Sequence, residues 1–305
     1  MIMILGVTAS GKGKIAFELA KQINAEIISI DSMKVYRRMD IGTAKPPKEI
    51  REQIPYHLID IVEPSESFSV GKFLDLAYEA IEQTKANGKN IIAVGGTALY
   101  IKALLYGLFE GPGADEQIRA KLQQRIQNEG LEVLYNELLK IDADACRLIH
   151  PNDTKRIIRA LEVYELTGRP ISSFQTQWNN QTVYDWKIIG LRREKELESK
   201  RINARVKKMI DTGLIDEVKR LLAEDKPLSK QARCAIGYAE IIDYLDGKTS
   251  LDKAVELIKQ NTRRLAKHQR TWFKTFKNVN WLDVTENETI DQIFKRVKNA
   301  AGLSD

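Results

Sequence analysis

The feature that most constrains the fold of this chain is a glycine-rich loop near its start. An apolar run, Met1 to Leu5, leads into Gly6-Val7-Thr8-Ala9-Ser10-Gly11-Lys12-Gly13, and the next segment, Lys14 to Ile23, has apolar residues at helical spacing. A strand, a glycine loop and a helix in this order are the context of a Walker A loop, whose backbone N–H groups and lysine surround phosphate oxygens. Gly6, Gly11 and Lys12 stand at the required spacing. We therefore predict that residues 6–13 bind phosphate.

The last position of this loop departs from the Walker A pattern. It should hold a serine or threonine whose hydroxyl ligates magnesium, but it is Gly13, and the neighbouring Lys14 cannot replace a hydroxyl. A backbone that needs positive φ at this position is one reason for a glycine here. The missing hydroxyl weakens the metal prediction more than the phosphate prediction. A turn that merely joins strand to helix is the alternative, which the agreement of spacing and context disfavours.

Further apolar runs predict a parallel sheet. Ala25 to Ile30 and Asn90 to Val94 are short, mainly apolar runs of the kind that form buried parallel strands, and Trp186 to Leu191 resembles a late strand. Phe73 to Ala86 has helical periodicity and is closed by Asn87-Gly88. The alternation of strand and helix predicts an α/β fold with right-handed crossovers, in which the sheet forms a P-loop core.

The pattern changes at the breaker cluster Glu110-Gly111-Pro112-Gly113. About 60 residues of helical periodicity with no convincing strand follow it. We predict that residues 113–185 form a helical insertion and that 1–112 and 186–305 form the core. In the last third we expect helices over 196–223, with a break at Gly213, over 241–245 and over 251–276. An edge strand is expected at 279–284.

Composition excludes several classes of protein. The chain has 305 residues, 43% of them hydrophobic and 30% charged, with a formal net charge of +6, which excludes disorder, collagen and small disulfide scaffolds. The two cysteines, Cys146 and Cys234, form no CxxC pair, which argues against a zinc knuckle and fits a reducing compartment. No apolar run reaches about 18 residues, so we expect no membrane span or signal peptide and a cytoplasmic protein.

Polar residues follow the second and third predicted strands. Asp31-Ser32 comes just after Ile30, and Gly95-Gly96-Thr97 follows Val94. The carboxyl ends of parallel strands meet at one edge, where open α/β sheets gather catalytic groups. By the glycine loop alone a nucleotide kinase is the first candidate, but these further segments indicate another activity.

Blocks along nearly the whole chain resemble the tRNA dimethylallyltransferase (tRNA isopentenyltransferase) family. Besides the glycine loop they are EIISIDSMKVYRRMDIGTAKP, PYHLIDIVEPSESFSV, HPNDTKRIIRALEVYELTGRP, RCAIGYAE and RRLAKHQRTWF, in the family's order. The resemblance implies transfer of a dimethylallyl group from dimethylallyl diphosphate to the exocyclic amine of the adenosine 3′ to a tRNA anticodon. It also implies that residues 6–13 hold the diphosphate of the donor. Val7, Gly13 and Ala98 depart from the family's usual residues.

The resemblance assigns catalytic roles to three side chains. Asp31 would be the general base, since a carboxylate can accept a proton from a weakly nucleophilic amine. Arg205, with Lys12, would stabilise the diphosphate leaving group, and Thr97 would contact the target nucleotide or the diphosphate. Local alternatives stay open: Asp31 can cap the next segment, Thr97 can bond to nearby backbone, and Arg205 can belong to a solvated basic face.

The resemblance also implies a tRNA footprint on both parts of the chain. Its residues are Asp31, Ser32, Met33, Lys34, Thr97, Arg119, Lys155, Arg156, Ile157, Ile158, Arg159 and Arg233. Basic residues on phosphates supply salt-sensitive affinity, but a solvated helical face is the ordinary alternative for such a run of charges. Tyr36 and Tyr100 are candidates to pack on the target base, with core packing as the alternative.

The expected partners are the tRNA anticodon loop and dimethylallyl diphosphate, with no membrane and no partner chain, so that the protein is a monomer. Magnesium (Mg²⁺) is the expected cofactor, and its ligands stay open because Gly13 has no hydroxyl. Two other functions remain: a P-loop small-molecule kinase, which the missing magnesium ligand disfavours, and a catalytically impaired tRNA-binding paralogue.

Overall fold

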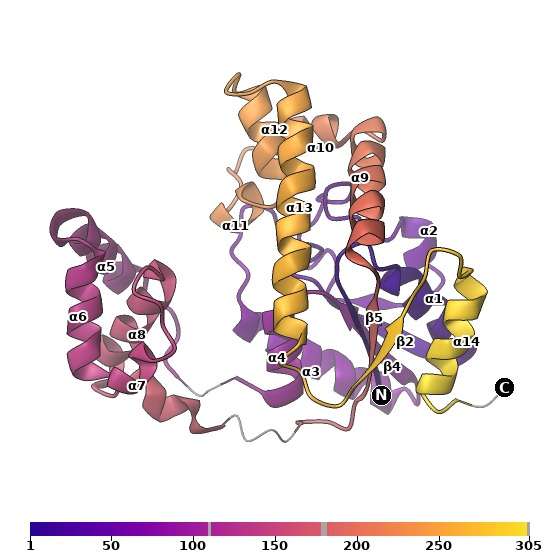
Figure 1. Ribbon diagram of the computed structural model, residues 1–305, viewed down its shortest axis with the longest axis horizontal. Helices are drawn as coiled ribbons and strands as arrows, with labels where there is room; N and C mark the ends of the chain where they lie inside the picture. The colour runs from indigo at the N-terminus through magenta and orange to yellow at the C-terminus, as the bar shows by residue number, and fades with distance from the viewer. Residues whose placement is uncertain (109–110, 178–181, 304–305) are drawn as a thin grey trace. The chain divides into compact units, whose positions relative to one another are not determined.

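The structure is a computed structural model that describes residues 1–108, 111–177 and 182–303. The chain divides into two units, residues 1–105 with 182–305, and residues 106–181 (Figure 1). The sequence placed the insertion at 113–185. Glu110 of the predicted breaker cluster, and residues 178–181 of the predicted insertion, lie outside the described residues. Each unit is described by itself below.

The first unit contains a six-stranded sheet in the order β3-β2-β4-β1-β5-β6, and every neighbouring pair is parallel. Its strands are β1 (Ile2–Gly6), β2 (Ala25–Ile30), β3 (Tyr56–His57), β4 (Asn90–Gly95), β5 (Lys187–Arg192) and β6 (Val279–Asp283). The α/β class, the parallel pairing and the edge position of β6 are confirmed. The short β3 was not predicted, because two paired residues give no periodicity.

Helices connect these strands and extend beyond them. They are α1 (Lys12–Gln22), α2 (Lys48–Arg51), α3 (Val70–Ala86), α4 (Ala98–Tyr106), α9 (Lys195–Asp211), α10 (Leu214–Leu222), α11 (Lys230–Arg233), α12 (Tyr238–Leu245), α13 (Leu251–Phe273) and α14 (Ile290–Ala300). The predicted helix over 251–276 ends at Phe273. The sequence analysis did not predict α4 or α14. In the part of the chain that the structure describes, no helix combines the length and apolar character that a membrane crossing requires.

Side-chain caps explain where several helices begin. Ser69 accepts a hydrogen bond from the backbone N–H of Lys72 and starts α3, and Ser250 does the same for α13 through Lys253. Gly213 adopts a left-handed φ of 99° between α9 and α10, as expected from the predicted break. These local signals set the helix ends without long-range contacts.

The sheet of the first unit is covered on both faces. Ile4 of β1 packs with Ile15 of α1 and with Ile293 and Val297 of α14 in one buried cluster. Helix α3 packs against β2 and β4, and its buried Phe73 belongs to no part of that cluster, so it covers the opposite face. Because both faces are occupied, the polar residues that follow the strands meet at the carboxyl edge.

The second unit is helical over its described residues. Its elements are α5 (Glu116–Glu129), α6 (Leu131–Ile141), α7 (Ala143–Cys146), α8 (Thr154–Thr167) and the 3₁₀ helix η1 (Ile171–Gln177). Ile157 and Ile158 lie in the buried core of this unit, with exposed fractions of 0% and 9%. These side chains face the neighbouring helices, so a contact with tRNA at these two positions stays a prediction that only their backbone could make.

Candidate active site

The glycine loop turns between β1 and α1 at the carboxyl edge of the sheet. Gly11 has a left-handed φ of 96°, and a Cβ on Gly6 would lie 3.0 Å from the carbonyl oxygen of Leu191, so both positions need glycine. Gly13 differs, because its φ is not positive and a Cβ there would meet no atom within 4 Å. The explanation of Gly13 by backbone geometry is therefore wrong.

Partly buried cations surround this loop. Lys12 donates from Nζ to the carbonyl of Val7 at 3.2 Å. Burial, followed by the nearby Lys34 and Arg205, lowers the pKa of Lys12 to about 7, although Asp31 acts in the opposite direction. Burial also lowers the pKa values of Lys34 and Arg205. Burial removes part of the water that stabilises the charged forms of these side chains, and an anionic ligand would favour the charged forms again.

Three arginines fix the outer side of the loop. Arg205 of α9 donates to Oγ1 of Thr8 at 3.0 Å, and Arg201, one helical turn earlier, donates to the carbonyl of Ala9 at 2.8 Å. Arg193, just after β5, donates to the carbonyl of Ser10 at 3.1 Å. The sequence analysis singled out Arg205 alone. The position of Arg193 directly after a predicted strand was the signal that could have found it.

Asp31 and Thr97 lie on adjacent strand ends. Oδ1 of Asp31 accepts from the backbone N–H of Met33 at 2.9 Å and of Lys34 at 3.3 Å. Oγ1 of Thr97 accepts from the N–H of Ser32 at 3.1 Å. The local roles weighed for Asp31 and Thr97 are therefore real. They leave room for chemistry, because within the described residues Oδ2 of Asp31 accepts no hydrogen bond and the carboxylate lines two cavities.

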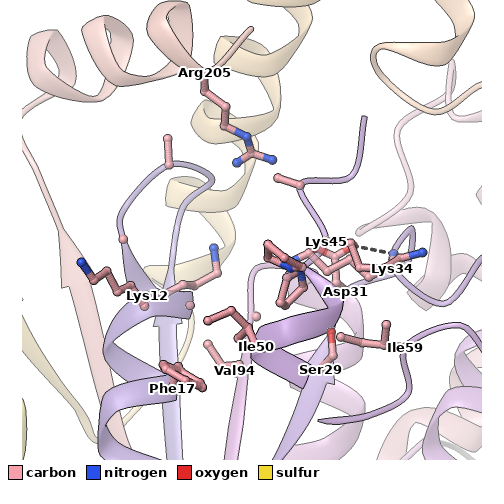
Figure 2. Close-up of a pocket in the computed structure, with 18 of the residues that line it drawn as sticks. Lys12, Phe17, Ser29, Asp31, Lys34, Lys45, Ile50, Ile59, Val94 and Arg205 are labelled. Carbon is pink, nitrogen blue, oxygen red and sulfur yellow. Dashed lines mark hydrogen bonds between the residues drawn. The ribbon is translucent and has the colours of Figure 1, made fainter. Parts of the chain in front are cut away.

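The first cavity has a volume of about 930 Å³ and lies against the glycine loop (Figure 2). Arg205 reaches toward the loop from one side, and Phe17, Ile50 and Ile59 form an apolar end on the other. Such a lining suits a ligand with an anionic head and a hydrocarbon tail.

The second cavity, of about 590 Å³, lies beside the first. Thr97, His268, Gln269 and Trp272 are among its lining residues. The residues that line both cavities are Lys12, Asp31, Lys34, Ala44, Arg205 and Met209. The cation cluster and the carboxylate therefore stand at the junction of two spaces of different chemistry.

The loop that follows Asp31 forms part of both cavity walls, and Glu217 of α10 holds it in place. The buried Glu217 carboxylate accepts from the N–H groups of Asp40, Ile41 and Gly42 at 2.8–3.1 Å, and from the hydroxyl of Tyr238 at 2.6 Å. Nothing in the local sequence pointed to Glu217, because the N–H of Ile41 lies 176 positions away along the chain.

Of the two roles left open for Tyr36 and Tyr100, the structure shows core packing. Tyr36 is fully buried, and Tyr100 is 6% exposed and stacked on Phe73 with a ring-centroid distance of 4.3 Å. Both rings belong to the core. Arg233 lies on α11, is half-exposed and approaches Asp246 at 3.9 Å.

The predicted basic footprint of the second unit separates into two kinds. Arg119 and Arg159 both donate to the fully buried Glu162, and Arg159 also donates to the carbonyls of Pro112 and Gly113. Burial would raise the pKa of Glu162, but hydrogen bonds from these arginines and from the backbone of Asp115 lower it below its usual value.

Lys155 and Arg156 of the same unit are exposed on α8, and Arg156 also approaches the carboxylate of Asp153 at 3.4 Å. The charges of Lys155 and Arg156 are therefore exposed to solvent, whereas those of Arg119 and Arg159 are neutralised by Glu162.

The donor set does not fit a magnesium ion held by the protein. Gly13 offers no hydroxyl, and the described residues contain no group of three or more His, Cys, Asp or Glu side chains placed to bind a metal. Oγ1 of Thr8 already accepts from Arg205. Ser10 is buried, and its Oγ would lie 2.6 Å from a Cβ on Gly6, away from the cavities.

Comparisons with known proteins connect this geometry to one family. Residues 34–276 match the family model described as IPP transferase. The chain is 46% identical over 288 residues to tRNA dimethylallyltransferase 2 of Geotalea uraniireducens (strain Rf4), covering 94% of this chain and 93% of the relative.

Solved structures agree. A tRNA isopentenylpyrophosphate transferase from Bacillus halodurans matches with a TM-score of 0.71 and 42% identity, covering 99% of this chain and 96% of that one. A eukaryotic dimethylallyltransferase acting on tRNA matches with a TM-score of 0.84 and 29% identity, covering 100% and 80%.

Proposed function

This chain belongs to the IPP transferase family, and from that premise we propose how it acts on its substrates. It is a tRNA dimethylallyltransferase, which transfers a dimethylallyl group from dimethylallyl diphosphate to the exocyclic amine of the adenosine 3′ to the anticodon and releases diphosphate. The assignment of its side chains to steps of that reaction is our proposal. The observation that carries it is the junction of the two cavities at Lys12, Asp31 and Arg205.

The first cavity takes the prenyl donor. Its cations and loop N–H groups bind the diphosphate, and its apolar end, formed in part by Phe17 and Ile50, accepts the five-carbon chain. The second cavity takes the adenine. Extruding a base from a single-stranded loop costs roughly a few kcal/mol, because no duplex pairing is lost.

In the transfer step the amine nitrogen attacks C1 of the dimethylallyl group, and the C–O bond to diphosphate breaks. The electron pair of that bond leaves with the diphosphate oxygen, where Lys12 and Arg205 stabilise the growing charge. Asp31 accepts the proton from the amine, with Oδ1 held by the turn and Oδ2 as the receiving oxygen. Thr97 orders this site by accepting from the N–H of Ser32.

Affinity for tRNA comes from basic residues outside the reaction site. We assign phosphate contacts to the exposed Lys155, Arg156 and Arg233, and base or backbone contacts to the cavity-lining residues Ser32, Met33 and Lys34. Arg119 and Arg159 support the helix that carries Lys155. The proposed compartment is the cytoplasm, where tRNA is processed, and the proposed state is a monomer.

Purified protein incubated with unmodified tRNA and labelled dimethylallyl diphosphate tests the function directly. The expected result is label on one adenosine of the anticodon loop, located by nuclease mapping, with release of diphosphate. Binding of tRNA without transfer of label would indicate an impaired paralogue. ATP turnover on a small molecule, with no tRNA product, would indicate a kinase.

A further inference from the structure

The side chain of Gln269 on α13 connects two loops that the reaction needs close together. Its Oε1 accepts from the backbone N–H of Thr8 at 2.9 Å, and its Nε2 donates to the carbonyl of Gly96 at 2.8 Å. The residue is 8% exposed and lines the second cavity. A carboxamide is needed here, because one partner is a donor and the other an acceptor.

The backbone around Gly96 is shaped for this contact. A Cβ on Gly96 would lie 2.6 Å from Nε2 of Gln269 and 3.3 Å from the carbonyl oxygen of Gly6. Any larger residue would separate the two loops or displace the carboxamide. The absence of a side chain at residue 96 therefore lets α13 clamp the end of β4 against the end of β1.

The two hydrogen bonds extend into the proposed catalytic groups on each side. On the side of the prenyl donor, the hydroxyl of Thr8 accepts a hydrogen bond from Arg205, and the backbone N–H of Thr8 donates to Gln269. On the side of the target amine, Gly96 precedes Thr97. The hydroxyl of Thr97 accepts a hydrogen bond from the backbone N–H of Ser32, which is next to Asp31. Gln269 thus contacts both strand-end loops from outside the sheet.

We propose that Gln269 is a positioning residue. Through its hydrogen bonds to Thr8 and Gly96 it sets the distance between the glycine loop, residues 6–13, here called the diphosphate cradle, and the site formed by Asp31 and Thr97. This inference rests on the proposed function. Gln269 takes no part in bond making. It acts on the reaction because a shift of the cradle by a fraction of an ångström misaligns C1 of the donor and the amine.

The substitution Gln269→Glu tests this role through its pH profile. An ionised carboxylate still accepts from Thr8 but repels the carbonyl of Gly96, whereas a protonated carboxyl group donates to that carbonyl and restores both bonds. At saturating substrates we expect the single-turnover rate, relative to wild type at the same pH, to fall about tenfold at pH 8. The ratio should rise as the pH is lowered toward 6.

Gln260→Glu is the matched control, because Gln260 is an exposed glutamine on the same helix and lines neither cavity. Its rate ratio should stay near one at every pH. Gln269→Met, which can neither donate nor accept strongly, should lower the ratio by a similar factor with no pH dependence. A wild-type rate for Gln269→Glu at pH 8, or a loss independent of pH, would overturn the proposal.

A readout without transfer separates this inference from the proposed function. Inorganic diphosphate should bind Gln269→Met about three- to tenfold more weakly than wild type, because Thr8 of the cradle loses its tether. Unchanged diphosphate affinity would count against a positioning role even if wild type transferred no prenyl group. If the wild type transfers no prenyl group but Gln269→Met still binds diphosphate more weakly, the proposed function is contradicted and the positioning role of Gln269 is supported.

Discussion

The basic residues of the two units are used in opposite ways. In the first unit, Lys12, Lys34 and Arg205 are partly buried where they line a cavity, and desolvation lowers the pKa of each. In the second unit, Arg119 and Arg159 converge on the buried carboxylate of Glu162. Both groups include arginines on helices, Arg205 on α9 and Arg159 on α8, so residue type and helical setting do not by themselves distinguish the two uses.

The difference shows how charge is prepared for a ligand. Cations desolvated beside a cavity are stabilised when an anion enters, so part of the binding free energy of diphosphate comes from relieving their mutual repulsion. Arginines already paired with Glu162 have no such gain to offer and stabilise the helices instead. The comparison leads to five predictions, in order of decreasing expected effect.

The largest effect is expected at Asp31. Asp31→Ala should lower the single-turnover rate by about two to four orders of magnitude, with little change in tRNA affinity, because the general base is lost. Asp31→Asn is the sharper variant, since its side-chain oxygen still accepts from Met33 and Lys34 and keeps the turn. If Asp31→Asn reacts at the wild-type rate, the carboxylate serves the turn alone.

Replacing Arg205 should have the next largest effect. Arg205→Met removes a preorganised cation from the leaving group and should lower the transfer rate by about a hundredfold. Lys207→Met is the control, because Lys207 is exposed on the same helix and lines neither cavity. Equal rates for the two variants would show that the Arg205 cation does not stabilise the leaving group.

Lys12 should make donor affinity depend on pH. Its pKa is lowered to about 7 in the free protein, and bound diphosphate favours the charged form and raises it again. Binding therefore takes up a proton above pH 7, and affinity should fall with rising pH by up to about tenfold per unit. Calorimetry in buffers of different ionisation enthalpy measures this uptake.

Lys12→Arg is the control for this prediction, since an arginine stays charged across the same range. Its proton uptake at pH 8 should vanish. The same uptake in wild type and Lys12→Arg would show that another group, such as the diphosphate itself, takes the proton.

In the second unit, exposed and paired residues should respond differently. Lys155→Ala with Arg156→Ala should weaken tRNA binding severalfold and reduce the slope of log affinity against log salt by roughly 0.7 to 0.9 per phosphate contact. Arg119→Ala with Arg159→Ala should mainly destabilise the unit, because Glu162 loses its partners. Filter binding over a salt series, together with thermal melting, measures both. A steeper loss of slope in the second pair would reverse the assignment.

The smallest effect is expected at Gly13. Gly13→Thr fits without strain, because φ is not positive and no atom lies within 4 Å of the new Cβ. A restored hydroxyl should lower the magnesium concentration for half-maximal transfer by about two- to fivefold, since magnesium keeps several waters in any case. Full activity with an unchanged magnesium requirement would show that a hydroxyl at residue 13 does not ligate magnesium.

The features that the sequence alone determined share a local physical origin. Short, mainly apolar runs predicted β1, β2, β4 and β5, since a strand covered on both faces needs no regular polar alternation. The glycine loop was recognisable because Gly6, Gly11 and Lys12 stand at the spacing of a Walker A loop between a strand and a helix. The rule that parallel strands end at one edge predicted that Asp31 and Thr97 lie together, whereas their catalytic roles came from the family resemblance.

Tertiary structure alone decided which polar groups meet. Gln269 holds Thr8 from 261 positions away, and Glu217 holds Ile41 from 176 positions away, so no local pattern announces either contact. Burial likewise decided that Tyr100 is core and that Arg159 is paired while Lys155 is exposed. Spacing along a helix specifies a shared face, but whether that face meets a carboxylate, a cavity or water depends on the elements packed against it.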